Sequence, residues 1–438
     1  MRRHLAFAVA ASLGAASASA QPSPLPPLLP GPATPVAPPA PPAMPANPEG
    51  LPTTPGVPFD PAKVKWPTEV GGKTISAVVG DLKSGDPTVQ ETALKMVQLF
   101  GPEAARRSAM RQVIGMVEDA DPGVRTNAVI LIGVIGFDNT KDFNDAVTKL
   151  SGLLNKTIKG SILRLHATRS LANLGPDAHA AIPTLCSAAD DPSWEVRAAV
   201  ADALGRLGAA TYEQTTVMEG PTAVKVPTLK REASRPAMQK LNFALIKDPS
   251  SAVRMEACQA LITLGPPHSA DPKQYQAVSQ PFTDAIASRL KLEKEPVVKV
   301  WLNLLHMMYD ERVFDSTLRL LIADVNSPDT AVRLQAMSAL TILGPKCLPA
   351  LEAVAKALRT GGTPVQVVAI QTMVSMGEYS AKSVLPELER FIAETAADPK
   401  QADIRNYAEQ GAKVLRKNKP APAALPVPAP APPAVAKP

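Results

Sequence analysis

Residues 191–208, with the sequence DPSWEVRAAVADALGRLG, contain one amphipathic helix together with the signals that start and end it. Asp191-Pro192 is typical of a helix start, because a short polar side chain followed by proline suits the first turn. The apolar residues that follow are spaced to share one helix face: Val196, Val200, Leu204 and Leu207. Gly208 comes next, where glycine commonly adopts the left-handed conformation that ends a helix. The stretch therefore predicts a helix that stops at Gly208 and buries one face.

The same frame recurs along the chain. We number it from its first apolar residue as position 0, so that Val196 is at 0, Leu204 at +8 and Gly208 at +12. Position 0 falls at nine places: residues 89, 124, 163, 196, 253, 298, 332, 365 and 404. A further amphipathic segment precedes each of them. Spacings that mostly lie between 33 and 45 residues are typical of a solenoid of helix pairs, because one pair cannot bury its apolar face alone.

This pattern resembles the HEAT-repeat family, in particular its short bacterial members of the bilin-lyase-like kind. The resemblance rests on the Asp-Pro…Val-Arg turn, the Ala- and Leu-rich helix behind it and the Leu-Gly stop. It implies a ladder of hydrogen bonds between successive repeats, made by the turn aspartate and the arginine at +1. The residues at those positions are Asp191, Arg197, Asp248 and Arg254. Gln90 and Gln366 replace the arginine in two repeats and depart from the ladder pattern.

We therefore predict an all-α fold, a right-handed α-solenoid of about nine HEAT-like helix pairs over residues 67–418. Residues 1–20 have the charged start, short apolar run and small-residue cleavage site of a secretory signal peptide. Residues 21–66 form a proline-rich linker and residues 419–438 a Pro/Ala-rich tail, and both are predicted to be disordered. Residues 209–235 interrupt the repeat as a polar, irregular insertion that is either functional or disordered.

The distribution of charge gives no support for nucleic-acid binding. The chain carries +6, but the signal peptide and residues 412–438 together hold seven cations and no acid, so residues 21–411 carry −1. A surface for nucleic acid needs a basic face that follows the phosphates. The arginines at +1 could imitate such a face, but a ladder to turn carboxylates is the favoured interpretation. We expect a protein or peptide partner, whose identity is unknown, and no binding of nucleic acid. No membrane span is expected after signal cleavage, and the sequence leaves the oligomeric state unknown.

No catalytic, cofactor-binding or metal-binding residue is predicted, and no cofactor is expected. The histidines of the mature chain, among them His166 and His306, lack metal-ligand spacing with one another or with Cys and carboxylates. The sequence has neither a glycine-rich phosphate loop nor a Gly-x-Ser-x-Gly motif. The three cysteines are expected to be small buried apolar residues rather than a disulfide pair: Cys186, Cys258 and Cys347.

Frame positions +2 and +9 lie seven residues apart, hence on one helix face, and they are mostly apolar with several methionines. In HEAT-like solenoids the second helix of each pair lines the concave side, and Met-bearing apolar grooves suit helix or peptide partners. These positions form a candidate partner-binding stripe: Leu165, Met255, Ile262, Val300, Met307, Leu334, Val367 and Val374. The alternative interpretation is that the same side chains pack between repeats.

Together these observations favour an exported, non-catalytic scaffold that binds a protein or peptide in the periplasm, in the cell envelope or outside the cell. An enzyme is the first alternative, because some short HEAT-repeat proteins resemble chromophore lyases that attach bilins to cysteines of partner proteins. Such an enzyme needs a pocket with acid or base groups, and the sequence has no evident set of them. A nucleic-acid-binding solenoid is the second alternative.

Overall fold

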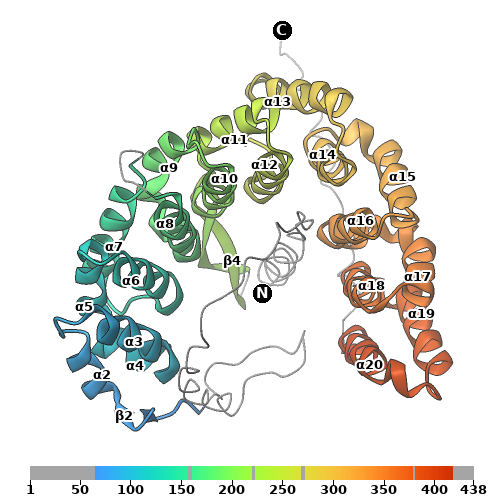
Figure 1. Cartoon of the computed structure of the whole chain (residues 1–438). Helices are drawn as coiled ribbons and strands as arrows, with labels where there is room; N and C mark the ends of the chain where they lie inside the picture. The colour runs from blue at the N-terminus through green and yellow to red at the C-terminus, as the bar shows by residue number, and fades with distance from the viewer. Residues whose placement is uncertain (1–64, 156–159, 220–221, 268–271, 378–379, 418–438) are drawn as a thin grey trace, which may run out of the picture. The chain divides into compact units, whose positions relative to one another are not determined.

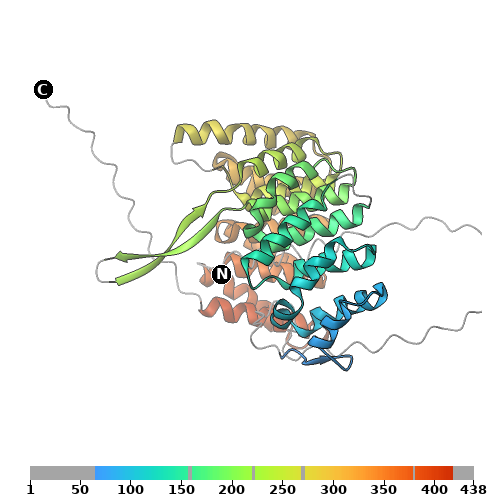
Figure 2. The ribbon, with the colours of Figure 1, turned by 90° about the vertical axis from the view of Figure 1, so that its left-hand side faces the viewer.

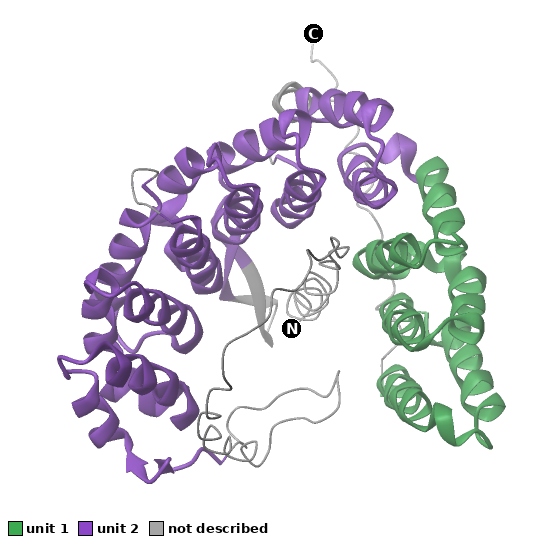
Figure 3. Cartoon of the chain, viewed as in Figure 1, with its two compact units in different colours: residues 1–20, 315–438 green, residues 21–314 purple. Residues whose placement is uncertain are grey.

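The computed structural model describes residues 65–155, 160–219, 222–267, 272–377 and 380–417. The predicted signal peptide, nearly all of the proline-rich linker and the tail therefore lie outside the described residues. The chain divides into two compact units, one with residues 21–314 (unit 2) and one with residues 315–438 and 1–20 (unit 1; Figure 3). In the described part, no helix combines the length and hydrophobicity that crossing a lipid bilayer requires.

The described part of unit 2 starts with a short antiparallel sheet and continues as six pairs of helices (Figure 1). The sheet strands are β1 (Glu69–Val70) and β2 (Lys73–Thr74). The first helices of the pairs are α2 (Ile75–Asp81), α4 (Pro102–Ser108) with α5 (Met110–Gly115), α7 (Thr140–Gly152), α9 (Ile182–Ala188), α11 (Arg235–Lys247) and α13 (Pro272–Leu292). The second helices are α3 (Pro87–Val97), α6 (Pro122–Ile135), α8 (Ser161–Leu174), α10 (Trp194–Gly208), α12 (Ser251–Leu264) and α14 (Pro296–Tyr309).

Unit 1 contains three further pairs of the same kind (Figure 3). They are α15 (Phe314–Val325) with α16 (Thr330–Leu343), α17 (Leu351–Thr360) with α18 (Thr363–Met376), and α19 (Ala381–Glu394) with α20 (Ala402–Lys417). Short 3-10 helices join the elements at Gln98–Phe100, Met116–Glu118, Gly175–Ala181, Glu311–Val313, Gly344–Ala350 and Pro399–Gln401. The prediction of an all-α solenoid of nine HEAT-like pairs is therefore confirmed within the described residues.

The burial of side chains follows the repeat frame. Position +4 is buried in all nine second helices, where its residues are Ala93, Ala128, Ala167, Val200, Ala257, Leu302, Ala336, Ala369 and Ala408. Position +8 is buried in every repeat except that of α14, where His306 is half-buried. Small residues allow neighbouring second helices to approach closely, since a methyl group on Gly205 of α10 would lie 2.7 Å from the Cβ of Ala260 on α12. Successive second helices are thus stacked against one another within each unit.

Five of the predicted glycine stops adopt the left-handed conformation, with φ between 59° and 86°: Gly101, Gly136, Gly175, Gly265 and Gly344. Gly208 does not, so the expectation of a left-handed cap there is wrong, although α10 does end at this residue. The chain leaves Gly208 through the extended residue Ala209 directly into a strand. A glycine is needed at position 208 because there is little room for a side chain, not because of its backbone conformation. An added Cβ would lie 3.1 Å from Ala237 and 3.2 Å from Leu264.

Residues 209–235 also differ from the prediction. They are not irregular but form an antiparallel hairpin of β3 (Thr211–Glu219) and β4 (Thr222–Arg231). Tyr212 lies opposite Leu229, and the register shifts between Thr211 and Tyr212. The hairpin joins α10 to α11 and projects away from the helices of unit 2 (Figure 2).

Candidate partner-binding site

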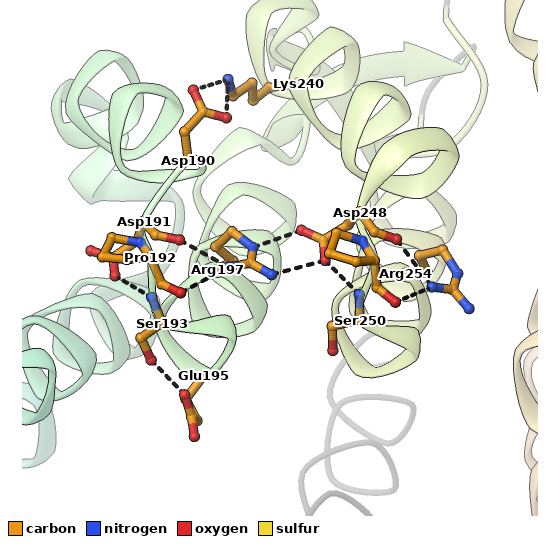
Figure 4. Close-up of polar contacts among 11 residues, drawn as sticks. Asp190, Asp191, Pro192, Ser193, Glu195, Arg197, Lys240, Asp248, Ser250 and Arg254 are labelled. Carbon is orange, nitrogen blue, oxygen red and sulfur yellow. Dashed lines mark hydrogen bonds and ion pairs between the residues drawn. The ribbon is translucent and has the colours of Figure 1, made fainter.

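The residues assigned to the ladder meet at the turns that precede α10 and α12 (Figure 4). Arg197 Nε and Nη2 donate to the two carboxylate oxygens of Asp248, over 2.7 and 3.1 Å. Its Nη1 donates to the carbonyl oxygens of Asp191 and Pro192, over 2.9 and 3.3 Å. Asp248 Oδ1 also accepts from the Ser250 amide at 2.9 Å, which orients the carboxylate. One arginine therefore ties the turn of its own repeat to the turn of the next.

The same arrangement continues on both sides. Arg164 donates to both oxygens of Asp191, over 2.7 and 3.1 Å. Arg254 donates to both oxygens of Glu293, each over 2.8 Å, and to the carbonyls of its own turn at Asp248 and Pro249. The longer glutamate thus takes the place of the expected aspartate before α14. The ladder runs without interruption from α8 to α14.

These ion pairs are buried, which strengthens them electrostatically. The hydrogen bonds that Arg197 donates to Asp248, and Arg254 to Glu293, raise the pKa of both arginines. Burial raises the pKa of Glu293, but hydrogen bonds from Arg254 and Arg289 outweigh it and hold the pKa at about 2. Buried pairs of this kind need both members, because a single charge left without its partner is costly. The ladder therefore sets the register of the repeats.

The two glutamines at position +1 keep only part of the arrangement. Gln90 Nε2 donates to the Leu82 carbonyl at 3.3 Å, and Gln366 Nε2 donates to the Leu358 carbonyl at 3.2 Å. Each bond stays within its own repeat. Among the described residues, neither side chain reaches the turn of the next repeat as the arginines do.

In the structure, the residues of the predicted partner-binding stripe fall into a buried group and a half-buried group. Ile262, Val300 and Met307 are buried, so they are not available to a partner, and the expectation that they line a groove is wrong. Position +9 instead contacts position +7 of the following second helix. This contact recurs between Gly133 and Ser170, Gly205 and Ala260, Thr341 and Thr372, and Val374 and Gly411. Side chains at +9 therefore pack between repeats, as the alternative interpretation stated.

The remaining stripe residues are half-buried: Leu165, Met255, Leu334 and Val367 at position +2, and Val374 at +9. A half-buried apolar side chain presents part of its surface to solvent. Position +2 on the second helices therefore retains some surface for a partner. Leu165 and Met255 belong to unit 2, and Leu334 and Val367 to unit 1.

The hairpin offers a surface that the sequence analysis did not identify. Tyr212 is 49% exposed and its cross-strand neighbour Leu229 is 43% exposed. The root is fixed, because Arg231 Nη2 donates to the Pro176 carbonyl at 2.8 Å and the Ser234 amide donates to the Gly208 carbonyl at 2.8 Å. The signal in the sequence was the Thr- and Val-rich composition of residues 211–231, which favours strands.

A group of charged residues lies on the second helices of unit 2. Burial, and then the charge of Asp202, raises the pKa of Glu256 to about 7, while Arg206 and Arg169 act in the opposite direction. Glu256 is half-buried on α12, and Arg206 Nε donates to Asp202 at 2.7 Å on α10. Only the fold brings these residues of α8, α10 and α12 together.

Burial determines the state of the described thiols and of two histidines. Cys258 and Cys347 are buried as expected, whereas Cys186 is half-buried, and all three are free thiols. Burial raises the pKa of all three, to about 12 for Cys347. Burial also lowers the pKa of His166 and His306, which favours their neutral forms. The described residues contain no group of His, Cys, Asp and Glu side chains placed to hold a metal ion.

Comparison with known proteins agrees with this geometry. Residues 161–217, which span α8, α9 and α10, match the family model of HEAT repeats. The chain is thus a repeat protein of the α-solenoid class. Together with the recurring frame, the match shows that the helix pairs of this chain resemble HEAT repeats. No curated protein sequence matches it significantly.

Several solved structures are similar to this chain in fold. They include an engineered protein (16% identity, 80% of this chain and 90% of that chain covered, TM-score 0.38). The complex of CpcE and CpcF of phycocyanin lyase from Nostoc is another (17%, 79% and 98%, TM-score 0.37). Yeast importin-beta is a third (13%, 78% and 46%, TM-score 0.46). Likeness at these TM-scores is too remote to indicate function.

Proposed function

We propose that the protein is an exported, non-catalytic HEAT-repeat scaffold that binds a protein partner, and that the β3–β4 hairpin is its main contact. The observation that carries the proposal is the projecting hairpin (Figure 2), which has an exposed apolar pair, Tyr212 and Leu229. A two-stranded hairpin is only marginally stable in water by itself. A partner that covers its apolar face or pairs with one of its edges would stabilise it.

The strands also offer a defined mode of binding. Each strand of a two-stranded hairpin is an edge strand, and an edge presents backbone N–H and C=O groups to which an extended segment can pair. Pairing of this kind gives affinity through the backbone, and pockets for alternate side chains give specificity. The anchored root at Arg231 holds the hairpin at a constant position on unit 2. The partner is therefore expected to contribute an extended, partly apolar segment.

The half-buried residues at position +2 supply a second, smaller contact. In unit 2 these are Leu165 and Met255, on α8 and α12. They belong to the same unit as the hairpin, which joins α10 to α11. We infer that a partner anchored on the hairpin gains additional apolar contact on these second helices.

The test replaces residues 212–230 with a short Gly-Ser linker. Thr211 and Arg231 are paired across the strands, so the ends of the deletion already lie together, and the root hydrogen bonds of Arg231 are kept. The matched control is Phe243→Ser, which removes an equally exposed aromatic residue (55%) from α11. Both variants should keep the helical signal of the wild type in far-ultraviolet circular dichroism.

Each protein is crosslinked in the envelope fraction of the exporting cell, purified and identified by mass spectrometry with its attached partner. The proposal expects one partner that is captured by the wild type and by Phe243→Ser but is lost with the hairpin. Equal capture with and without the hairpin would assign binding to another surface. Recovery of the chain only from the cytosolic fraction would contradict export.

A further inference from the structure

The first junction of the solenoid has the acceptors of a ladder rung but lacks the arginine. At the complete rungs, the arginine at +1 makes two sets of bonds. It donates to the carbonyls at frame positions −5 and −4 of its own turn, and to the carboxylate at −5 of the next repeat. In the first repeat position +1 is Gln90. Its amide turns to the Leu82 carbonyl and leaves both sets of acceptors without the usual donor.

The acceptors at this junction match those of the complete rungs one for one. Positions −5 and −4 of the first repeat are Ser84 and Gly85, and position −5 of the second repeat is Asp119. Among the described residues, no hydrogen bond to the carbonyl oxygens of Ser84 and Gly85 occurs. The Asp119 carboxylate is oriented as in the complete rungs, because its Oδ1 accepts from the amide two residues on, here Asp121, at 2.9 Å.

A cavity of about 480 Å³ lies where the guanidinium would be. Its lining residues come from the two turns: Ser84, Gly85, Pro87 and Gln90 from the first, and Asp119, Ala120, Asp121 and Pro122 from the second. Gly85, Pro87, Ala120 and Pro122 are exposed, so the cavity is open to solvent. Its size falls in the range of ligand sites, roughly 300–1,000 Å³.

The charges around the cavity favour a cation. Asp119 and Asp121 line it, and the Glu91 carboxylate lies against Gly123 at the start of α6. Lys95 Nζ pairs with Glu91 at 3.4 Å, but neither this lysine nor any other side chain is bound to the Asp119 carboxylate among the described contacts. Arg125 Nη1 is bound to the carbonyls of Asp119 and Ala120, over 2.6 and 2.8 Å. Arg125 thus uses the backbone of Asp119 and leaves its carboxylate to the cavity.

We propose that this junction binds the guanidinium group of an arginine side chain supplied by a partner polypeptide. The guanidinium takes the position that Arg197 occupies three repeats later. Two of its nitrogens donate to the Asp119 carboxylate and the third to the carbonyls of Ser84 and Gly85. A planar group with five donors satisfies both sets at once, whereas an ammonium group cannot bind a carboxylate in the same forked manner.

The other glutamine junction supports the assignment by contrast. Gln366 makes the same hydrogen bond within its own repeat as Gln90 does. The −5 position of the repeat that follows it is Pro399, which has no carboxylate. The first junction therefore combines a missing arginine with a retained aspartate, and the later junction does not.

The experiment titrates the mature chain with N-acetyl-arginine amide at constant ionic strength, with the amide signals of Gly85 and Asp119 followed by NMR. The lysine and citrulline analogues are the controls. The proposal expects saturable binding of the arginine compound at about millimolar concentration. We expect binding of the lysine compound at least about tenfold weaker and no binding of citrulline, which has the same shape without the charge.

Three variants test the site itself. Gln90→Arg supplies the arginine from within, so it should raise the melting temperature and abolish binding. Asp119→Asn should reduce affinity at least about tenfold, as expected for loss of charged hydrogen bonds. Arg197→Gln should create a second site of the same kind between Asp191 and Asp248. Equal binding of arginine and lysine, or undiminished binding by Gln90→Arg, would overturn the proposal. Since the probe does not involve the hairpin, failure here leaves the proposed scaffold function untouched.

Discussion

At the scale of single residues, Arg197 determines how two repeats meet. Its side chain is 15% exposed and that of Asp248 is 7% exposed, so both charges are largely removed from water. Removing charges from water is costly, and the cost is offset only while each charge keeps its partner and its hydrogen bonds. The ladder therefore contributes specificity of stacking, because any other register would leave a buried charge unpaired.

The first prediction concerns this pair. Arg197→Met keeps much of the apolar stem but leaves Asp248 buried without its cation, so unfolding free energy should fall by about 3–5 kcal/mol. The control is Arg312→Met, because Arg312 is 79% exposed in its pair with Asp310 and such pairs contribute about 0–1 kcal/mol. Urea denaturation measures both. Equal losses would mean that the ladder does not hold the repeats together.

The second prediction concerns pH. Burial raises the pKa of Glu256 to about 7, so the folded protein retains a proton that the unfolded chain releases above its ordinary value near 4.5. The stability that Glu256 contributes is fully present below the pKa of the unfolded chain and is lost as the pH rises through the pKa of the folded protein.

Between about pH 5 and pH 8, the wild-type melting temperature should therefore fall, and Glu256→Gln should reduce that fall. At the upper end the variant should be more stable by about 1–3 kcal/mol. Glu394→Gln, at an exposed site on α19, is the control and should follow the wild-type profile. If Glu256→Gln left the dependence of melting temperature on pH unchanged, Glu256 would be ionised in the folded protein over this whole pH range.

At the scale of elements, the second helices are held by close approach as much as by large side chains. Gly205 of α10 leaves room for Ala260 of α12, and Gly133 of α6 leaves room for Ser170 of α8. Ser170 Oγ also donates to the Val129 carbonyl at 2.7 Å. In unit 1 the corresponding contact is polar, because Thr341 and Thr372 join α16 to α18 by a hydrogen bond of 2.8 Å.

The third prediction tests this approach. In Gly205→Ala, the new methyl group would lie 2.8 Å from the Cα of Ala260, so the backbones of α10 and α12 must separate. The expected loss is about 1–3 kcal/mol, as for other overpacked sites. Gly152→Ala is the matched control, because nothing lies within 4 Å of its added Cβ. The control should be neutral or should gain up to about 1 kcal/mol. A stable Gly205→Ala would show that the helices yield easily at this contact.

The fourth prediction separates the two parts of the former stripe. Val300 is 1% exposed, so Val300→Glu should bury an unpaired carboxylate and cost more than about 3 kcal/mol. Leu334 is half-buried at the same frame position, and Leu334→Glu should cost about 1 kcal/mol or less because its charge can reach water. Thermal melts distinguish the two. A large loss in both would leave no surface for a partner at position +2.

At the scale of the whole molecule, the described units are flanked by segments of very different composition. Residues 21–61 hold seventeen of the 47 prolines, and the last nineteen residues are again rich in proline and alanine. The body between them gains its core repeat by repeat, so its length is not limited as that of a single globular core is.

The fifth prediction concerns export. Cleavage after Ala18-Ser19-Ala20 should give a mature chain that begins at Gln21. Intact-mass spectrometry of protein purified from the envelope fraction measures this directly. Retention of Met1 in a form that resists salt washing would indicate an uncleaved anchor instead.

The limits of sequence reasoning are visible at particular residues. The register of buried positions could be predicted, because the spacing of Val253, Ala257 and Leu261 follows from helix geometry alone. The hairpin was missed because its strands contain many polar residues and no regular apolar alternation, and strand formation depends on pairing between residues as far apart as Tyr212 and Leu229. The role of Gly208 was misjudged because the contact with Ala237 crosses from one helix to the next.

The sequence by itself determined the repeat and its register, since both depend on residues close together in the chain. Tertiary structure alone decided which side of each second helix faces its neighbour. Positions +2 and +9 share a helix face, but +9 packs against the next second helix, whereas several +2 residues remain partly exposed. It also decided that Glu293 completes the rung of Arg254, and that the carbonyls of Ser84 and Gly85 share a cavity with the Asp119 carboxylate. These contacts join separate repeats, and their geometry depends on how the helices stack, which local spacing does not specify.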